Sequence, residues 1–347
     1  MNGGKGESPS GGRSTQHDVA RLAGVHHSTV SRALNPSRRN LLDPETVVRV
    51  ASAAERLGYR PNALARGLKT SRSRVTGVIA PAISSPEVAT IVEAYEVRIR
   101  EAGYTTLVMS SGHDAKALAA AGAQLMASRA EGIIVVTAKS PDFVMDALEL
   151  DGTPAVVIGA AHRGVSTVSI DHRLGAELAV AHLIRLGHRR IGLISEGRTA
   201  ARGAAQRDGY EAAVERAHLE FDEGLIETSE PTRPASGAEA CAALFHRGRA
   251  PTAIFATSDA TALGCYTALG DFGLRVPGDI SVVGYGNSSY GRYVSPPLTT
   301  VSLPLAAAGN EAAALILEQL GETAPDESRQ VQLRPYLLQR LSSGRAP

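Results

Sequence analysis

Residues 15–35 read TQHDVARLAGVHHSTVSRALN, and this stretch predicts how the first part of the chain folds. Thr15 and Asp18 have the spacing of a capping box, in which a hydroxyl caps a helix and an acid three residues later bonds back to the cap. Gly24 is suited to end this helix where the chain must turn sharply. A second helix is predicted over roughly residues 27–34. The stretch therefore indicates two short helices joined by a tight turn.

A third helix is predicted shortly afterwards. Asp43, Pro44 and Glu45 supply an N-cap, a proline at the first helical position and an acid in the first turn. Apolar residues then recur at helical spacing until Gly58. Two helices joined by a glycine turn and braced by a third are typical of a helix-turn-helix unit that binds DNA. The alternative is a plain three-helix bundle with a polar face.

Polar residues of the second helix are candidates for DNA contact. The helix leaves His27, Ser28, Ser31 and Arg32 outward, where they can reach base edges. Arginine is the natural bidentate partner of guanine. Thr29 is suited to a phosphate contact.

The charge of the chain is unevenly distributed. Residues 1–75 carry 13 Lys and Arg against five Asp and Glu, a net charge of +8, and the remaining residues carry a net −7. A basic first part on an acidic remainder suggests a polyanion as partner of the first part.

Length and composition exclude several classes of protein. With 347 residues, 43% apolar and 20% charged, two or three ordinary domains are expected. No apolar run approaches the ~18 residues of a membrane span, and residues 1–14 form a Gly/Ser-rich tail, not a signal peptide. Cys241 and Cys265 fit no metal or disulfide framework. These features favour a cytoplasmic protein.

Motifs of catalysis are not found in the sequence. It has no glycine-rich phosphate loop, no nucleophile elbow and no His-Glu-x-x-His run, and its histidines lack metal-site spacing. We therefore expect no enzyme activity, no cofactor and no metal.

After Arg74 short apolar runs alternate with longer helical stretches, which predicts parallel sheets with helices on both faces. The predicted strands are 75–81, 105–109, 132–137, 154–158, 168–170, 190–195, 253–256, 280–285 and 299–302. The predicted helices are 86–102, 114–128, 174–186, 205–217, 235–247, 260–272 and 305–320. About 270 residues are too many for one such sheet, so two lobes fit better.

The chain resembles the LacI/GalR (lactose/galactose repressor) family of transcriptional regulators. The resemblance rests on DVARLAGV at 18–25, STVSRALN at 28–35 and LGYRPNALA at 57–65, and it continues to about residue 340. It implies that His27, Ser28 and Arg32 read bases.

The DNA-binding part departs from the family in two places. His26 stands where the family usually has a serine cap, and the segment from Arg38 to Leu42 is about two residues longer than usual. The extra arginines, Arg38 and Arg39, are expected to add phosphate contacts, and Thr15 is placed on the same DNA surface.

The resemblance also implies a hinge at residues 61–69 that folds on the operator. Two hinge helices would pair in the minor groove, where Leu68 would wedge a base step open at a cost of a few kcal/mol. Asn62 would cap the helix, Ala65 would lie on the DNA side, and Arg66 and Lys69 would meet phosphates. The alternative is an ordinary linker.

For the remainder, the resemblance implies a two-lobed periplasmic-binding-protein type I fold with a ligand cleft between the lobes. The expected chain crossings are near 170–173, 297–303 and 327–331. The expected divisions are a tail at 1–14, the helix-turn-helix domain at 15–60, the hinge at 61–73 and a body at 74–343, with an N-lobe of about 74–171 and 303–328 and a C-lobe of about 172–300 and 330–343.

The expected ligand positions differ from the family pattern. Glu87 and Val88 replace two aromatic residues, Gln206 replaces an arginine that clamps the ligand, and Gly286 replaces a carboxylate; the asparagine of an Ala-Asn-Asp run is Ser258. The candidates are therefore Gln206, Arg207, Ser258 and Asn287, whereas Asp171 is expected to serve the lobe crossing. An unusual ligand, a ligand held by Arg207, Ser258 and Asn287, and no ligand at all remain open.

Together these features predict a homodimeric repressor, with a tetramer left open, that binds a palindromic DNA operator under control of a small-molecule effector of unknown identity. The effector is either carbohydrate-related or a non-sugar ligand. The alternatives are an effector-independent DNA binder and, more distantly, an exported solute-binding protein.

Overall fold

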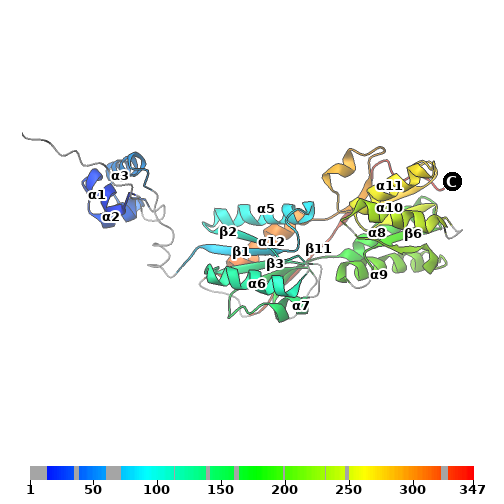
Figure 1. Ribbon diagram of the computed structural model, residues 1–347, viewed down its shortest axis with the longest axis horizontal. Coiled ribbons are helices and arrows are strands. Elements are labelled where there is room, and N and C mark those ends of the chain that lie inside the picture. Colours follow the sequence, from blue (N-terminus) through cyan, green and yellow to red (C-terminus); the bar gives the residue numbers. More distant parts are fainter. Residues whose placement is uncertain are drawn as a thin grey trace, which may run out of the picture. The chain divides into compact units, whose positions relative to one another are not determined.

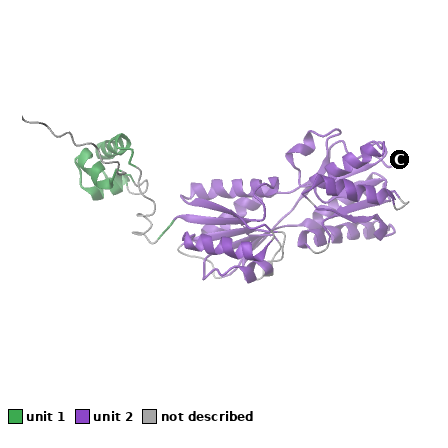
Figure 2. Cartoon of the chain, viewed as in Figure 1, with its two compact units in different colours: residues 1–73 green, residues 74–347 purple. Residues whose placement is uncertain are grey.

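The computed structural model describes residues 14–34, 39–59, 72–112, 114–137, 141–159, 164–197, 200–230, 232–246, 250–321 and 327–347. The chain divides into two compact units, residues 1–73 and residues 74–347 (Figure 2). The expected hinge at 61–69 lies outside the described residues, as does Arg38.

The first unit contains the three predicted helices (Figure 1). They are α1 (Gln16–Ala23), α2 (His27–Ala33) and α3 (Pro44–Arg56), and a short 3-10 helix η1 (Arg39–Leu41) precedes α3. Val19, Val30 and Val50, one from each helix, are fully buried against one another. This small apolar cluster is what holds the three helices together.

Local hydrogen bonds fix the start and the end of α1. The Thr15 backbone N–H donates to Asp18 Oδ2 at 2.9 Å, and the Asp18 N–H donates to Thr15 Oγ1 at 3.4 Å, which completes the predicted capping box. The hydrogen bonds from Thr15 lower the pKa of Asp18 below its ordinary value. Gly24 follows the helix with φ +63°, a left-handed conformation that favours glycine.

His26 performs the capping role that a serine usually fills. Its Nδ1 accepts from the backbone N–H of Ser28 at 3.3 Å and lies 2.8 Å from Ser28 Oγ. Because Nδ1 is the acceptor, the neutral imidazole carries its proton on Nε2. Arg49 of α3 donates from Nε to Ala23 O at 3.0 Å and so joins α3 to the end of α1.

The second unit contains two six-stranded sheets, one in each lobe (Figure 1). In the N-lobe the order is β11 (Gln330–Leu333), β5 (Ser166–Ile170), β4 (Ala155–Ile158), β3 (Gly132–Val136), β1 (Val75–Ala80) and β2 (Thr105–Ser110), and every neighbouring pair is parallel. In the C-lobe it is β12 (Tyr336–Leu338), β10 (Thr299–Ser302), β9 (Ser281–Tyr285), β8 (Ala253–Ala256), β6 (Ile191–Ser195) and β7 (Ile226–Thr228), with only β12 antiparallel.

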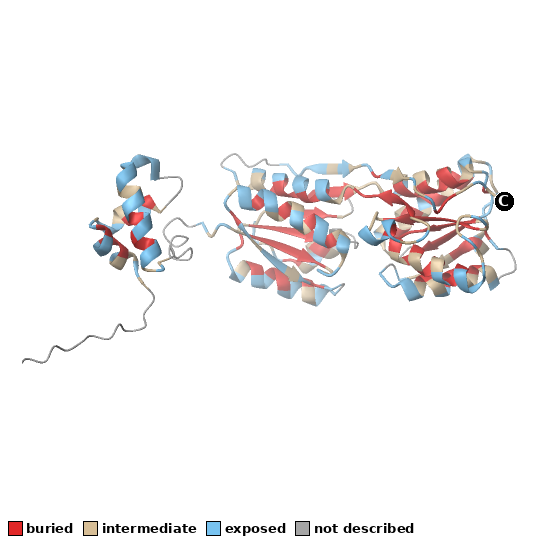
Figure 3. Cartoon of the chain, turned by 90° about the horizontal axis from the view of Figure 1, so that it is seen from above, coloured by how far each residue is buried: buried red, intermediate tan, exposed pale blue. Residues whose placement is uncertain are grey.

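Helices cover both faces of each sheet, and the buried strands lie between them (Figure 3). In the N-lobe these are α5 (Pro86–Glu101) and α12 (Leu305–Gln319) on one face and α6 (Ala115–Ala127) and α7 (Pro141–Ala147) on the other. In the C-lobe they are α8 (His172–Arg185) and α9 (Ala201–Arg216) on one face and α10 (Pro234–His246) and α11 (Asp259–Asp271) on the other, with 3-10 helices η2 (Glu223–Leu225) and η3 (Ser289–Arg292). This arrangement confirms the predicted fold class.

Three expectations from the sequence need correction. Residues 330–333 belong to the N-lobe and not to the C-lobe, because β11 pairs in parallel with β5, Val331 opposite Val168. The third crossing therefore falls after β11, at residues 334–335, and not near 327–331. Helix α9 begins at Ala201, four residues before its expected start at 205.

Close packing of α9 on α8 depends on Gly209. A Cβ built at this position would collide with the Arg173 carbonyl oxygen and would lie 2.9 Å from the Ala176 Cβ. The backbones of the two helices approach each other here, so no side chain fits without a shift.

None of the described helices is long and apolar enough to cross a membrane.

We expect Gly209→Ala to lower the free energy of unfolding by about 1–3 kcal/mol, since the added methyl group overpacks a helix contact. Gly270→Ala is the matched control, because Gly270 lies in α11 with open space around its Cβ position; this change should be neutral or stabilising by up to about 1 kcal/mol. Urea unfolding of both variants measures the difference. Equal stability of the two variants would contradict the packing argument.

The role of His26 is tested by exchanging the cap. His26→Ala should weaken the start of α2 by about 1 kcal/mol, whereas His26→Ser should preserve it. The readout is hydrogen exchange at the Ser28 amide, the proton that His26 accepts. Faster exchange is expected in the alanine variant alone, and unchanged exchange in that variant would show that the imidazole does not cap the helix.

Candidate functional site

Helix α2 presents a polar face to solvent. His27, Ser31 and Arg32 are exposed, Ser28 and Thr29 are half-buried, and only apolar side chains of the helix are buried in the core. Within the described residues the Arg32 guanidinium has no acidic partner, so its charge is available to a ligand. A capped, rigidly packed helix with one exposed cation and several hydroxyl groups is suited to a base-reading contact.

Three histidine rings lie together beside this face. The His17 and His27 rings stack with centroids 5.0 Å apart, and the His26 ring lies 4.1 Å from that of His27. Gln16 Nε2 donates to the His27 carbonyl oxygen at 2.6 Å. His17 was not a candidate from the sequence. The contact extends the polar surface from α2 onto α1.

The other predicted DNA-binding residues are placed as follows. Thr15 is exposed, but its hydroxyl is hydrogen bonded to Asp18 Oδ2 at 2.6 Å. Arg39 is exposed in η1. The remaining candidates, Arg38, Asn62, Ala65, Arg66, Leu68 and Lys69, lie outside the described residues.

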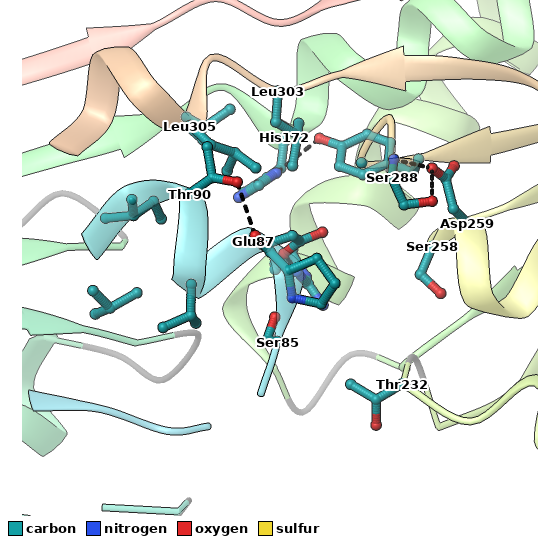
Figure 4. A pocket seen from close by; sticks show the side chains of 18 of the residues that line it. Ser85, Glu87, Thr90, His172, Thr232, Ser258, Asp259, Ser288, Leu303 and Leu305 are labelled. Atoms are coloured by element: carbon teal, nitrogen blue, oxygen red, sulfur yellow. Dashed lines mark hydrogen bonds and ion pairs between the residues drawn. The ribbon is translucent and has the colours of Figure 1, made fainter. Parts of the chain in front are cut away.

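A cleft of about 1450 Å³ separates the two lobes of the second unit. Its volume exceeds the roughly 300–1000 Å³ of a typical small-molecule pocket. The N-lobe contributes Ser85, Glu87 and Thr90, and the C-lobe contributes residues such as Thr232 and Ser258 (Figure 4). Hydroxyl and charged groups from both lobes therefore face one cavity.

Two of the four effector candidates line this cleft, but their side chains have internal partners. Ser258 caps α11, accepting from the Thr261 N–H at 3.0 Å. The Asn287 amide donates to Ser302 Oγ at 3.2 Å and accepts from Arg340 Nη2 at 2.7 Å. Both side chains support the cleft wall.

The other two candidates are not among the cleft-lining residues of the described chain. Gln206 is fully buried; its Nε2 donates to the Thr257 carbonyl oxygen at 3.3 Å, and its Oε1 has no partner among the described residues. Arg207 forms ion pairs with Glu211 at 2.7 Å and Glu223 at 2.5 Å. The expectation that Arg207 grips a ligand is thus corrected, because acids of its own lobe hold its guanidinium outside the cleft.

The arginine of the cleft is Arg202, in the first turn of α9. Its Nε and Nη2 donate to the two oxygens of Glu196 at 2.8 and 3.4 Å, and its Nη1 donates to Glu87 Oε2 at 3.1 Å. Burial alone would lower the pKa of Arg202, but the charges of Glu87 and Glu196 outweigh it and raise the pKa above its ordinary value. The side chain is 18% exposed and stays charged.

A neutral histidine and a tyrosine lie at the base of the cleft. His172 Nδ1 is 2.8 Å from the Tyr285 hydroxyl (Figure 4). Burial, assisted by the nearby Arg202 charge, lowers the pKa of His172 to about 3, so the ring is neutral at physiological pH. Burial raises the pKa of Tyr285 as well. This pair offers hydrogen bonding without charge.

Carboxylates at the helix starts complete the site. Asp171 caps α8, its Oδ1 accepting from the Leu174 N–H at 2.9 Å, in keeping with its expected role at the lobe crossing. Asp259 accepts from the Ser288 hydroxyl at 2.8 Å (Figure 4). In the part of the chain that the structure describes, no group of three or more His, Cys, Asp or Glu residues could hold a metal ion. The arrangement is suited to binding a polar molecule.

Family models match both units. The model of bacterial regulatory proteins, lacI family, matches residues 15–62, and that of the periplasmic binding protein-like domain matches residues 180–343. The HTH-type transcriptional repressor PurR of Serratia proteamaculans (strain 568) is 33% identical over 338 residues, 96% of this chain and 98% of its own. The PurR of Proteus mirabilis (strain HI4320) is 32% identical over 337 residues, again 96% and 98%.

Solved structures agree with this assignment. The transcriptional regulator CelR in complex with cellobiose is 30% identical, with a TM-score of 0.72 over 95% of this chain and 100% of its own. The lac repressor dimer bound to operator and the anti-inducer ONPF is 26% identical, with a TM-score of 0.84 over 96% of this chain and 100% of its own. The resemblance seen in the sequence is thereby confirmed, and the chain belongs to the lacI family of bacterial regulatory proteins.

Proposed function

We propose that this repressor binds a pseudo-palindromic operator as a homodimer, with α2 of each protomer in the major groove of one half-site. The observation that carries the proposal is the exposed polar face of α2, on which Arg32 has no acidic partner within the described residues. Half-sites about one helical turn apart follow from this geometry. His27, Ser28 and Ser31 accompany Arg32 at base edges, while Thr29 and Arg39 meet phosphates.

The cleft between the lobes is the proposed effector site. Its volume of about 1450 Å³ and its lining of hydroxyl and charged groups fit a polar small molecule. CelR, a relative of similar fold, is described in complex with cellobiose, which supports binding of a small molecule by this chain. The internal bonding of Ser258 and Asn287 favours recognition through other groups of the cleft.

Arg32→Ala tests the base contact. Loss of a bidentate guanine contact should weaken operator binding by roughly 1–3 kcal/mol and relax the preference at one base pair. Arg56→Ala is the matched control, since Arg56 is also exposed, in the last turn of α3, and its removal costs the same charge. Titration against the operator and against random DNA measures the loss of affinity and the loss of base preference. An equal loss on the two DNAs would refute base reading by Arg32.

The hinge proposal has its own test, although Leu68 lies outside the described residues. If Leu68 wedges a base step open, Leu68→Ala should reduce both the DNA bend and operator affinity, because the kink would no longer be supported. Gel mobility of circularly permuted operator fragments reports the bend, and the unfolding curve of the second unit is the control. A wild-type bend in the variant would exclude the wedge.

A further inference from the structure

Arg202 connects two carboxylates that belong to different lobes. Glu196 follows β6 in the C-lobe, as Arg202 does, and bonds to two nitrogens of the guanidinium. Glu87 belongs to α5 of the N-lobe and bonds to Nη1 at 3.1 Å, although it is 115 positions away in the sequence. Glu196 therefore orients the guanidinium, and Glu87 carries the connection between the lobes.

Helix electrostatics make the position of Arg202 costly without its partners. The N-terminal end of a helix carries positive partial charge, which favours an acid and disfavours a cation in the first turn. Glu87 in the first turn of α5 follows this preference, whereas Arg202 in the first turn of α9 opposes it. In the part of the chain that the structure describes, neither helix start has a side-chain cap. The carboxylates of Glu87 and Glu196 offset the positive partial charge of the helix end and the cost of burying the arginine.

Gly286, which has no side chain, leaves space for the Glu87 carboxylate in the cleft. Gly286, at the end of β9, has φ +121°, and a Cβ built there would lie 3.0 Å from Glu87 Oε1. A side chain at position 286 is thus disfavoured both by the backbone and by Glu87. Position 286 is where the sequence lacks the expected carboxylate, and an acid from the opposite lobe now lies beside it.

We propose that Glu87 and Arg202 form an interlobe latch that closes the cleft of the ligand-free protein, and that the effector is a small molecule whose oxyanion replaces Glu87 on Arg202. This inference rests on the effector site of the proposed function and names its ligand chemistry. When the lobes separate, Glu196 stays with Arg202 and Glu87 leaves with the N-lobe. Nη1 is then left without an acceptor in a side chain that is only 18% exposed.

The charges in the cleft favour an oxyanion over a neutral group at this position. Glu87 is 33% exposed and lies at a favourable helix end, so water can solvate it after it leaves. Arg202 is more buried and lies at an unfavourable helix end. The guanidinium therefore loses more stabilisation than the Glu87 carboxylate when the pair separates. A carboxylate or phosphate oxygen restores the arrangement that Glu87 provided, because charge-assisted bonds to a guanidinium are stronger than neutral ones.

The latch is tested by measuring the distance between the lobes. Ala123→Cys on α6 and Glu239→Cys on α10 are exposed positions for a fluorescent dye pair, and the native Cys241 and Cys265 are fully buried. Mixing with excess unlabelled protein leaves one labelled subunit per oligomer. Glu87→Ala should raise the open-to-closed ratio roughly tenfold, within the usual range of coupling between sites. A wild-type distance distribution in this variant would overturn the latch.

Glu230→Ala is the matched control for the removal of an acid. Glu230 also lines the cleft, but its partner Arg233 lies in the same lobe at 3.3 Å. This variant should retain the wild-type distance distribution. Equal opening in both variants would show that cleft charge in general, and not the bond to Arg202, sets the arrangement of the lobes.

The ligand chemistry is tested on the wild-type protein with the same dye pair. Acetate is the probe, because its carboxylate can take the place of Glu87 on Arg202, and it should raise the open population. Acetamide and sodium chloride at equal ionic strength should not. Inorganic phosphate in place of acetate distinguishes a phosphate-bearing effector from a carboxylate-bearing one. Failure of both anions, or equal opening by acetamide, would overturn the oxyanion proposal.

Operator binding, measured on the same samples, separates this inference from the proposed function. If wild-type protein prefers an operator while Glu87→Ala stays closed, the repressor stands and the latch fails. If wild-type protein binds no DNA sequence preferentially, the proposed function fails whatever the distance between the lobes.

Discussion

The cleft depends on one constraint: the chain crosses between its two sheets, and the carboxyl ends of strands from both sheets line the same cavity. Within the described residues the crossings lie at Asp171, at residues 303–304 and at residues 334–335. In strand–helix alternation each carboxyl end is followed by a helix start, so α5, α8, α9 and α11 all begin at the cleft. The cavity is therefore surrounded by the positive ends of helices.

That field explains most of the charges at the site. Glu87, Asp171 and Asp259 lie at or beside the starts of α5, α8 and α11, where a carboxylate is favoured. Arg202 at the start of α9 is the exception, and two of the cleft's carboxylates contact it. A cation at the positive end of its own helix needs anions for stability. The anion that bonds to Arg202 in addition to Glu196 therefore influences whether the two lobes are open or closed.

The sequence predicted the first unit more completely than the cleft because the signals differ in range. The capping box joins Thr15 to Asp18, three residues apart, and Gly24 ends the same helix. The pair of Glu87 and Arg202 spans 115 positions. The predicted start of α9 at 205 also left Arg202 outside the helix, whereas the observed start at Ala201 places it in the first turn. The resemblance places the ligand-clamping arginine at position 206, so it makes Gln206 and its neighbour Arg207 candidates and gives no signal for Arg202.

The bonding of the cleft wall also limits which residues can respond to a ligand. Ser258, Asp259 and Asn287 bond to partners in their own lobe, so separation of the lobes leaves these contacts intact. Among the cleft contacts described above, the bond from Arg202 to Glu87 alone joins the two lobes. A small molecule shifts a conformational equilibrium only through interactions that differ between its states. Recognition at Arg202 meets that requirement, whereas recognition at the wall residues alone would bind a ligand without moving the lobes.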